Sequence, residues 1–298
     1  MDNQTIPDSQ ASAGGNAAET TQRTLPKFIF VGPTKTGTTW IDAYLRTRSD
    51  IVLPAAIKET FYFDKRYDRG ADWYRSLFEK SPNRGLCVEV APSYFAKSEA
   101  CARIARDIPD VQVVCTLRHP LDRAVSHYFH YLQRGAPDVG LPQMCGEYAD
   151  ILEAGHYHRH VSMWREALGT ENVHVLFYDQ MASDPQGFSQ AVCDILGVPA
   201  DLQGAEIPTG KLNSAAVPRY PALAKARHAV ARSVRGKKAT ALLKRLWVGP
   251  LKTLVEGKAP DPERRAQIRR EALQYRPLFL ADIEGLEEDL GVDLSAWK

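Results

Sequence analysis

The stretch from Phe28 to Trp40 constrains the fold more than any other part of the sequence. Apolar, β-prone residues lead into Gly32, and the loop that follows holds Lys35 and Gly37 before a segment with helical spacing begins. A strand, a glycine loop and a helix in this order direct backbone N–H groups and the positive end of a helix dipole toward an anion. The sequence therefore predicts a phosphate-binding loop.

The lysine of this loop lies at an unusual position. In nucleoside triphosphatases the lysine directly follows the second glycine, whereas here Thr38 has that position and Lys35 lies before Gly37. The displacement argues against an ordinary ATP-binding loop. Because two glycines in a strand-to-helix turn are often no more than turn chemistry, other parts of the chain have to support the phosphate site.

Length and composition fit an α/β protein. The chain has 298 residues, of which 44% are apolar, which is ample for a core. A net charge of +2 is too small to imply binding to nucleic acid. The five cysteines are scattered without C-x-x-C spacing, and their odd number argues against a disulfide network. Buried free thiols and a reducing, cytoplasmic location are therefore expected.

Two segments differ from the rest in composition. Residues 1–24 are rich in small polar residues and are interpreted as a disordered tail rather than a secretory signal. Residues 222–256 are basic with a mostly helical pattern, and they lie within a single domain predicted for residues 25–298. No apolar run approaches the roughly 20 residues that span a membrane. A peripheral membrane contact and the oligomeric state stay open.

Hydrophobic patterns alternate between strands and helices along most of the chain. Buried strands are predicted at 28–32, 86–90, 111–117 and 173–177, with a short strand at 51–54. Helical spacing occurs at 39–48, 71–80, 98–108, 120–132, 145–168, 185–196 and 264–290. Such alternation predicts a parallel sheet that is covered by helices on both faces. Ligands of these sheets bind beyond the carboxyl ends of the strands.

A second candidate phosphate site follows the predicted strand 111–117. Arg118 ends this strand, and Ser126 lies eight residues later on the next helix. An arginine and a serine so placed can bind a doubly charged phosphate through charge-assisted hydrogen bonds. The alternative is an arginine at a strand end with a serine on a solvated helix face. Together with the glycine loop, the phosphate interpretation is favoured.

A lysine and a glutamate precede an aromatic run in the segment from Lys58 to Asp64. A lysine beside a glutamate is ordinarily a solvated pair, but here Phe61 and Phe63 would bury its surroundings. Burial raises the pKa of a carboxyl group toward the range in which a general base works. Glu59 is therefore a candidate base.

These motifs in combination resemble those of the sulfotransferases that use 3′-phosphoadenosine-5′-phosphosulfate (PAPS). The loop from Gly32 to Thr39 resembles their 5′-phosphosulfate loop, and Arg118 with Ser126 resembles their 3′-phosphate motif. The segment Lys58–Asp64 resembles the Lys-Glu-x-x-Phe-Phe segment of the heparan-sulfate-type branch. The resemblance implies a P-loop-like three-layer domain with a central parallel sheet, followed here by a C-terminal helical extension.

The resemblance also implies an activity. A sulfuryl group would pass in line from PAPS to a hydroxyl of a small-molecule, lipid or sugar acceptor, leaving adenosine 3′,5′-bisphosphate, with no metal. Lys35 and Glu59 would be catalytic, with Glu59 as the general base. The residues implied in cofactor binding are Pro33, Thr34, Lys35, Thr36, Gly37, Thr38, Thr39, Trp40, Arg118, Ser126, Tyr178, Lys211, Asn213 and Arg219.

The acceptor side is implied less specifically. The segment from Glu89 to Tyr94 resembles the family's Glu-x-Thr-Pro-x-Tyr segment, but Ala91 replaces the hydroxyl residue and Val90 stands where some glycan-modifying members have lysine. A contact to an anionic glycan at that position is therefore not expected. The residues implied near the acceptor are Lys58, Phe61, Phe63, Ser93 and Tyr94.

Three alternatives stay open at this point. Phenol- and steroid-type members of the family use a histidine as the base, so the rival bases are His119, His127, His130, His156, His158 and His160. A small-molecule kinase with a P-loop would need a lysine at position 38 and a metal-binding aspartate after a strand, and Arg118 ends the relevant strand instead. A nucleotide-binding module without catalysis is the third alternative.

Overall fold

The computed structural model describes residues 25–55, 57–200, 204–208 and 259–298. The predicted tail at 1–24 and the basic segment at 222–256 lie outside the described residues.

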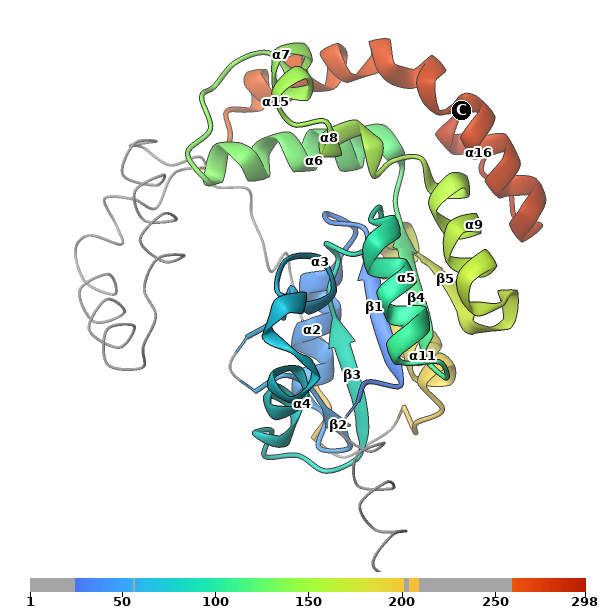
Figure 1. The fold of residues 1–298 in the computed structure, drawn as a ribbon. Helices are drawn as coiled ribbons and strands as arrows, with labels where there is room; N and C mark the ends of the chain where they lie inside the picture. The colour runs from blue at the N-terminus through green and yellow to red at the C-terminus, as the bar shows by residue number, and fades with distance from the viewer. Residues whose placement is uncertain (1–24, 56, 201–203, 209–258) are drawn as a thin grey trace, which may run out of the picture.

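A sheet of five parallel strands forms the centre of the molecule (Figure 1). The strand order is β2-β3-β1-β4-β5. The strands are β1 (Phe28–Gly32), β2 (Ile51–Val52), β3 (Leu86–Val90), β4 (Gln112–Leu117) and β5 (Val173–Phe177). The predicted parallel sheet is thus confirmed. The edge strand β2 is shorter than predicted, since Pro54 has no N–H group to continue a ladder.

The two faces of the sheet carry separate layers of helices, as alternating residues of β1 show. Phe28 and Phe30 pack against α2 (Thr38–Thr47) and α11 (Pro185–Leu196). Ile29 and Val31 belong to the larger core on the opposite face. That face is covered by α3 (Tyr62–Lys65), α4 (Ala71–Glu79), α5 (Ser98–Asp107) and α9 (Tyr157–Leu168). Because side chains of a strand alternate between faces, this division confirms the predicted three layers.

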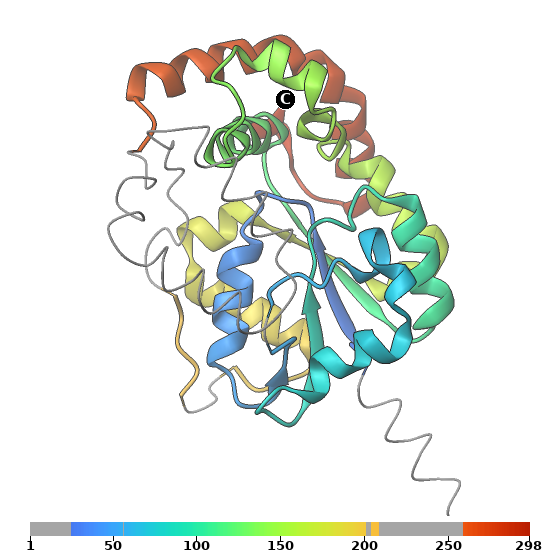
Figure 2. The same ribbon diagram turned by 60° about the vertical axis from the view of Figure 1, so that its left-hand side comes forward.

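Further helices lie beyond the carboxyl ends of the strands. Figures 1 and 2 show α6 (Pro120–Gln133) crossing above the sheet, with the C-terminal helices outside it. The helices around it are α7 (Leu141–Glu147), α8 (Asp150–Glu153), α15 (Pro262–Ala272) and α16 (Arg276–Leu290). The predicted helical stretch 145–168 is divided into α7, α8 and α9. The breaks lie at Tyr148 and near Gly155.

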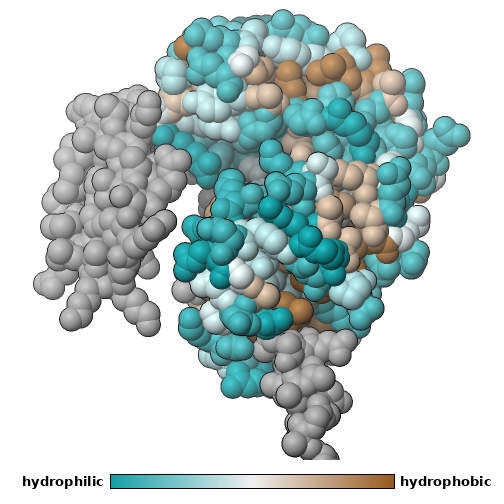
Figure 3. All heavy atoms as spheres, viewed as in Figure 1, coloured by the Kyte–Doolittle hydropathy of each residue, from teal (hydrophilic) through white to brown (hydrophobic). Residues whose placement is uncertain are grey.

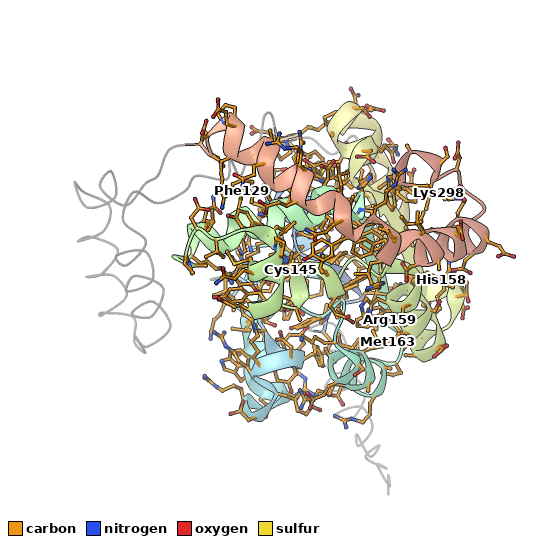
Figure 4. All side chains as sticks on the ribbon, turned by 90° about the horizontal axis from the view of Figure 1, so that it is seen from above. Phe129, Cys145, His158, Arg159, Met163 and Lys298 are labelled. Atoms are coloured by element: carbon orange, nitrogen blue, oxygen red, sulfur yellow. The ribbon has the colours of Figure 1, made fainter. Side chains whose placement is uncertain are left out.

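The C-terminal helices cap two of their neighbours. The Asp282 carboxylate on α16 accepts hydrogen bonds from the backbone N–H groups of His158 and Arg159, in the first turn of α9. Figure 4 labels these two residues beside the C-terminal helices. The Glu271 carboxylate on α15 accepts one from Leu141 N–H at 2.6 Å, at the start of α7. First-turn N–H groups have no partner within their own helix, so the C-terminal extension completes α7 and α9.

The surface and the thiols agree with an ordinary globular protein. Figure 3 shows a largely hydrophilic face with hydrophobic residues gathered over the C-terminal helices, where Leu273 and Leu278 are exposed. All five cysteines are free and buried, as predicted. Among the described helices, none combines the length and the apolar character that crossing a membrane requires.

Candidate functional site

The glycine loop ends at a helix whose N-terminus has no side-chain cap. Helix α2 begins at Thr38, and its N-cap residue Gly37 has φ 94°. Trp40 N–H donates to the Gly37 carbonyl at 2.8 Å, whereas the N–H groups of Thr38 and Thr39 have no partner among the described residues and are open to an anion. Within the loop, Thr36 Oγ1 donates to the Pro33 carbonyl at 2.6 Å and is fully buried. This bond shapes the loop from inside and leaves its N–H edge free.

Both loop glycines are required by their surroundings as well as by their positive φ angles. A Cβ atom at Gly32 (φ 96°) would lie 2.6 Å from Pro92 Cβ, in the segment that follows β3. A Cβ atom at Gly37 would lie 2.6 Å from the end of the Met181 side chain on α10 (Tyr178–Ser183). The loop is thus wedged between the ends of β3 and β5.

A cavity of about 1060 Å³ opens at the carboxyl ends of the strands, where the topology predicts a ligand. Sites for one drug-sized ligand measure about 300–1,000 Å³, so this cavity has room for a nucleotide and part of a second substrate. It brings together thirteen of the residues expected at the site: Thr34, Lys35, Gly37, Thr38, Thr39, Trp40, Lys58, Glu59, Phe61, Ser93, Arg118, Ser126 and Tyr178.

Lys35 is the central cation of the cavity. Its backbone is left-handed, with φ 78°, and among the described residues no hydrogen bond or ion pair holds its ammonium group. Burial, together with the neighbouring charge of Arg118, lowers the pKa of Lys35 to about 8. A half-buried cation that repels its neighbours is stabilised by an anionic ligand.

Arg118 combines a backbone fixed by a hydrogen bond with a side-chain donor that has no partner among the described residues. Its backbone carbonyl accepts a 2.6 Å hydrogen bond from the Tyr157 hydroxyl, and its guanidinium lies 4.4 Å from the centre of the Tyr178 ring. Its Nε is buried and has no hydrogen-bond partner in the described part of the chain. Buried donors without partners are rare in folded proteins, so this arginine is suited to bind an anion.

Lys58 lies closer to the glycine loop than expected. We expected it near an acceptor, but its Nζ donates to Thr39 Oγ1 at 3.2 Å and approaches Thr38 Oγ1 at 3.4 Å. Its neighbour Glu59 lines the same cavity. Burial raises the pKa of Glu59, and the Lys58 charge opposes that rise. The predicted upward shift of the glutamate pKa is therefore present.

Four expected site residues do not line the cavity. Pro33 and Thr36 stay inside the loop, as described above. Phe63 and Tyr94 are buried in the core beside α4, with 1% and 0% of their surfaces exposed. The expectation that Phe63 and Tyr94 contact an acceptor is corrected accordingly, because the fold turns both side chains away from the cavity. Lys211, Asn213 and Arg219 lie outside the described residues.

Of the six rival histidines, two line the cavity and four do not. His127 and His130 line the cavity, and burial lowers the pKa of His127 well below its ordinary value. His119 caps α6 by accepting from Leu121 N–H at 3.2 Å. The remaining three line no part of the cavity and contact α16 or α8: His156, His158 and His160. Only His127 and His130 can therefore compete with Glu59.

Several charged residues of the cavity were missed, among them Asp64, Lys97 and Arg134. Asp64 lines it with a side chain that is 5% exposed, and neither carboxylate oxygen has a hydrogen-bond partner among the described residues. Lys97 and Arg134 add positive charge to its wall. Asp64 belongs to the same motif as Glu59, and its place in that motif could have identified it as a site residue. Lys97 follows a loop, and Arg134 lies at the end of a helix. Neither position carries a comparable signal in the sequence.

An uncapped helix at a glycine loop, two cations without carboxylate partners among the described residues, and a parallel sheet together define a P-loop-like phosphate-binding α/β protein. The comparison with known families is more specific. The chain belongs to the sulfotransferase family, since the model of the sulfotransferase domain matches residues 25–214.

Curated relatives and a solved structure agree with this assignment. The chain is 28% identical over 203 residues to human heparan sulfate glucosamine 3-O-sulfotransferase 3B1, covering 65% of this chain and 51% of that protein. It is 30% identical over 186 residues to the mouse 3-O-sulfotransferase 6, covering 59% and 54%. The chain thus spans about half the length of these relatives. The crystal structure of a sulfotransferase from Alicyclobacillus acidocaldarius has the same fold, with a TM-score of 0.63, 21% identity, and coverage of 92% and 98%.

Proposed function

We propose that this protein transfers a sulfuryl group from PAPS to a hydroxyl group of an acceptor. Membership of the sulfotransferase family supports the type of reaction. The observation that carries the proposal is that one cavity holds the open glycine loop, two cations without a carboxylate partner among the described residues, and a half-buried carboxylate. The loop and the cations can bind an anionic donor, and the carboxylate can accept a proton from the acceptor hydroxyl.

The cations of the cavity fit a donor with two separate anionic groups. Lys35, Thr38 and the loop N–H groups would hold the 5′-phosphosulfate, which supplies the group to be transferred. Arg118 and Ser126 would hold the 3′-phosphate, and the buried Arg118 Nε without a partner is the observation that favours an anion there. Tyr178 fixes the Arg118 guanidinium from the other side.

The chemical roles follow from charge and position. Glu59 would accept the proton of the acceptor hydroxyl while the oxygen forms its bond to sulfur. Lys35 would stabilise the negative charge left on the phosphate oxygen when the old sulfur–oxygen bond breaks. Positioned charge of this kind in a water-poor site is usually the largest contribution to a rate. Lys58, bonded to Thr39, would hold the loop beside the base.

Calorimetry with adenosine 3′,5′-bisphosphate tests the donor site. We expect binding without added metal, and we expect Arg118→Ala to weaken it at least tenfold, since hydrogen bonds to charged groups contribute about 1.5–3 kcal/mol. The affinity for adenosine 5′-monophosphate, which lacks the 3′-phosphate, should change little in the same variant. Binding of ATP with magnesium but not of the bisphosphate would refute the proposal.

Turnover of Glu59→Gln, measured with radiolabelled PAPS and a panel of phenols, sterols, hydroxylated lipids and saccharides, tests the base. The panel includes heparan-type oligosaccharides because the relatives' names specify heparan sulfate. We expect bisphosphate affinity to be retained and turnover to fall by about 100-fold or more. If most activity remains, the role of base passes to His127 or His130.

The cytoplasmic location expected from the buried thiols remains a prediction.

A further inference from the structure

A buried carboxylate lies behind the candidate base. Glu89, on β3, is fully buried and does not line the cavity. Its partners among the described residues are three hydroxyl groups and the backbone N–H of Thr60, with no cation. A carboxylate is costly to bury unless it is well hydrogen-bonded, and the three hydroxyl bonds are arranged unequally on its two oxygens.

The two oxygens of Glu89 face different parts of the fold. Oε2 accepts from the Tyr74 hydroxyl at 2.6 Å. Oε1 accepts from Thr60 Oγ1 at 2.5 Å and from the Tyr94 hydroxyl at 3.2 Å. Thr60 directly follows Glu59 in the chain. One oxygen is thus bonded to α4, and the other is bonded to the segment that carries the candidate base.

The hydroxyls on the Oε1 side also hold backbone. Tyr62 N–H donates to the Tyr94 hydroxyl at 2.9 Å and to Thr60 Oγ1 at 3.1 Å. Thr60 Oγ1 and the Tyr94 hydroxyl oxygen also lie within hydrogen-bond distance of each other, at 3.0 Å. Because Glu89 accepts the Thr60 hydroxyl proton at 2.5 Å, the lone pairs of Thr60 Oγ1 are directed toward Tyr62 N–H and the Tyr94 hydroxyl. A group that donated a proton from position 89 would reverse this orientation.

The backbone held in this way is strained. Phe61, between Thr60 and Tyr62, has φ 53°, a left-handed conformation that disfavours residues with a side chain. Strained backbone persists only where its surroundings fix it, and it tends to occur at functional sites. Here the surroundings that fix it are the hydroxyls oriented by Glu89.

We infer that Glu89 is a positioning residue for the transfer reaction, which acts through Thr60 and Tyr94 to fix the turn that presents Glu59 to the cavity. This inference rests on the proposed role of Glu59. The competing explanation is that the network stabilises the fold and has no part in turnover. The asymmetry of the two oxygens separates these explanations.

Single hydroxyl deletions provide the test. Thr60→Val and Tyr94→Phe each remove a bond on the Oε1 side with little change in volume. Tyr74→Phe is the matched control, because it removes a bond to the same carboxylate but none of its hydrogen bonds reach residues 59–63. We expect kcat to fall at least tenfold in the first two variants and less than twofold in the control. Thr60→Ser, which keeps the hydroxyl, should restore most of the turnover.

Two further measurements do not depend on turnover. Hydrogen exchange at the Tyr62 amide should be faster in Thr60→Val and Tyr94→Phe than in Tyr74→Phe. Calorimetry should give the same affinity for adenosine 3′,5′-bisphosphate in all three, because the donor loop is not touched. The direct variant Glu89→Gln is added only if it unfolds cooperatively, and it should resemble Thr60→Val.

The outcomes are distinguishable from a failure of the proposed function. If Glu59→Gln keeps its turnover, the base has been misassigned. If Glu59→Gln is inactive while Thr60→Val and Tyr94→Phe match Tyr74→Phe in kcat and in amide exchange, the inference about Glu89 is overturned and the network is structural.

Discussion

Lys35 combines two unfavourable properties in the folded protein. Its backbone is left-handed, although it has a side chain, and its ammonium is half-buried beside Arg118. Each would cost free energy in an empty site, on the order of 1 kcal/mol or more. An anionic donor relieves the second cost directly, because its phosphate charge replaces the lost water.

The pH dependence of turnover should report these charges. Lys35 has a lowered pKa of about 8, so kcat/KM for the donor should fall as the pH rises above about 8 and the free enzyme loses this proton. Burial raises the pKa of Glu59, so kcat/KM for the acceptor should fall on the acid side at a pH above the ordinary glutamate value of 4.5. Initial rates between pH 4 and 10 measure both limbs.

The control for this profile is Lys35→Arg, whose side chain keeps its charge throughout that range. We expect its alkaline limb to disappear even if its maximal rate is lower. An unchanged fall above pH 8 in this variant would assign that limb to another group.

At the scale of elements, the glycine loop depends on two neighbours of unequal stiffness. A Cβ at Gly32 would meet the Cα and Cβ atoms of Pro92, which belong to backbone or a rigid ring. A Cβ at Gly37 would meet the flexible end of Met181. The two positions have nearly equal φ angles, 96° and 94°, so they differ in contacts and not in backbone strain.

Alanine substitutions separate strain from contact. Gly70, with φ 78° and nothing within 4 Å of its added Cβ, serves as the control for strain alone. We expect a loss in free energy of unfolding of about 1 kcal/mol for Gly70→Ala, slightly more for Gly37→Ala, and about 3 kcal/mol or more for Gly32→Ala. Urea unfolding measures all three, and equal losses would mean that strain alone decides.

The elements themselves were predictable, whereas contacts across the chain were not. Periodicity is local, so it was sufficient for the strands and for α2, α5, α6 and α11. Lys58 meets Thr39 only because a loop returns 19 residues later, and no spacing in the sequence encodes that return. Ser93 faces the cavity while Tyr94 faces the core. Adjacent residues of one motif thus point in opposite directions, and the motif does not indicate which of the two faces the cavity.

At the scale of the whole molecule, the last described residues support the phosphate site from behind. Trp297 is buried and packs against His119, Tyr157 and Phe177, with ring centres 5.8–6.3 Å apart. Tyr157 in turn donates its hydroxyl hydrogen to the Arg118 carbonyl. The C-terminal extension therefore contributes to the site without lining it at this point.

Trp297→Ala should consequently affect stability and binding together. We expect a loss of about 3–5 kcal/mol in the free energy of unfolding and a several-fold weaker affinity for adenosine 3′,5′-bisphosphate in the protein that stays folded. Trp73→Ala, on α4 at the other end of the core, should lower stability but keep the affinity. Unchanged affinity in Trp297→Ala would show that Arg118 does not depend on this support.

The adjacency of Lys58 and Glu59 has a consequence for how acceptor preference can change. One peptide unit joins the residue bonded to the donor loop to the candidate base, so an insertion here would separate the two halves of the reaction. Arg134, at the end of α6, and Arg265, on α15, line the same cavity from other elements. Libraries aimed at new acceptors should therefore diversify these two positions and leave residues 58–60 and Ser126 unchanged.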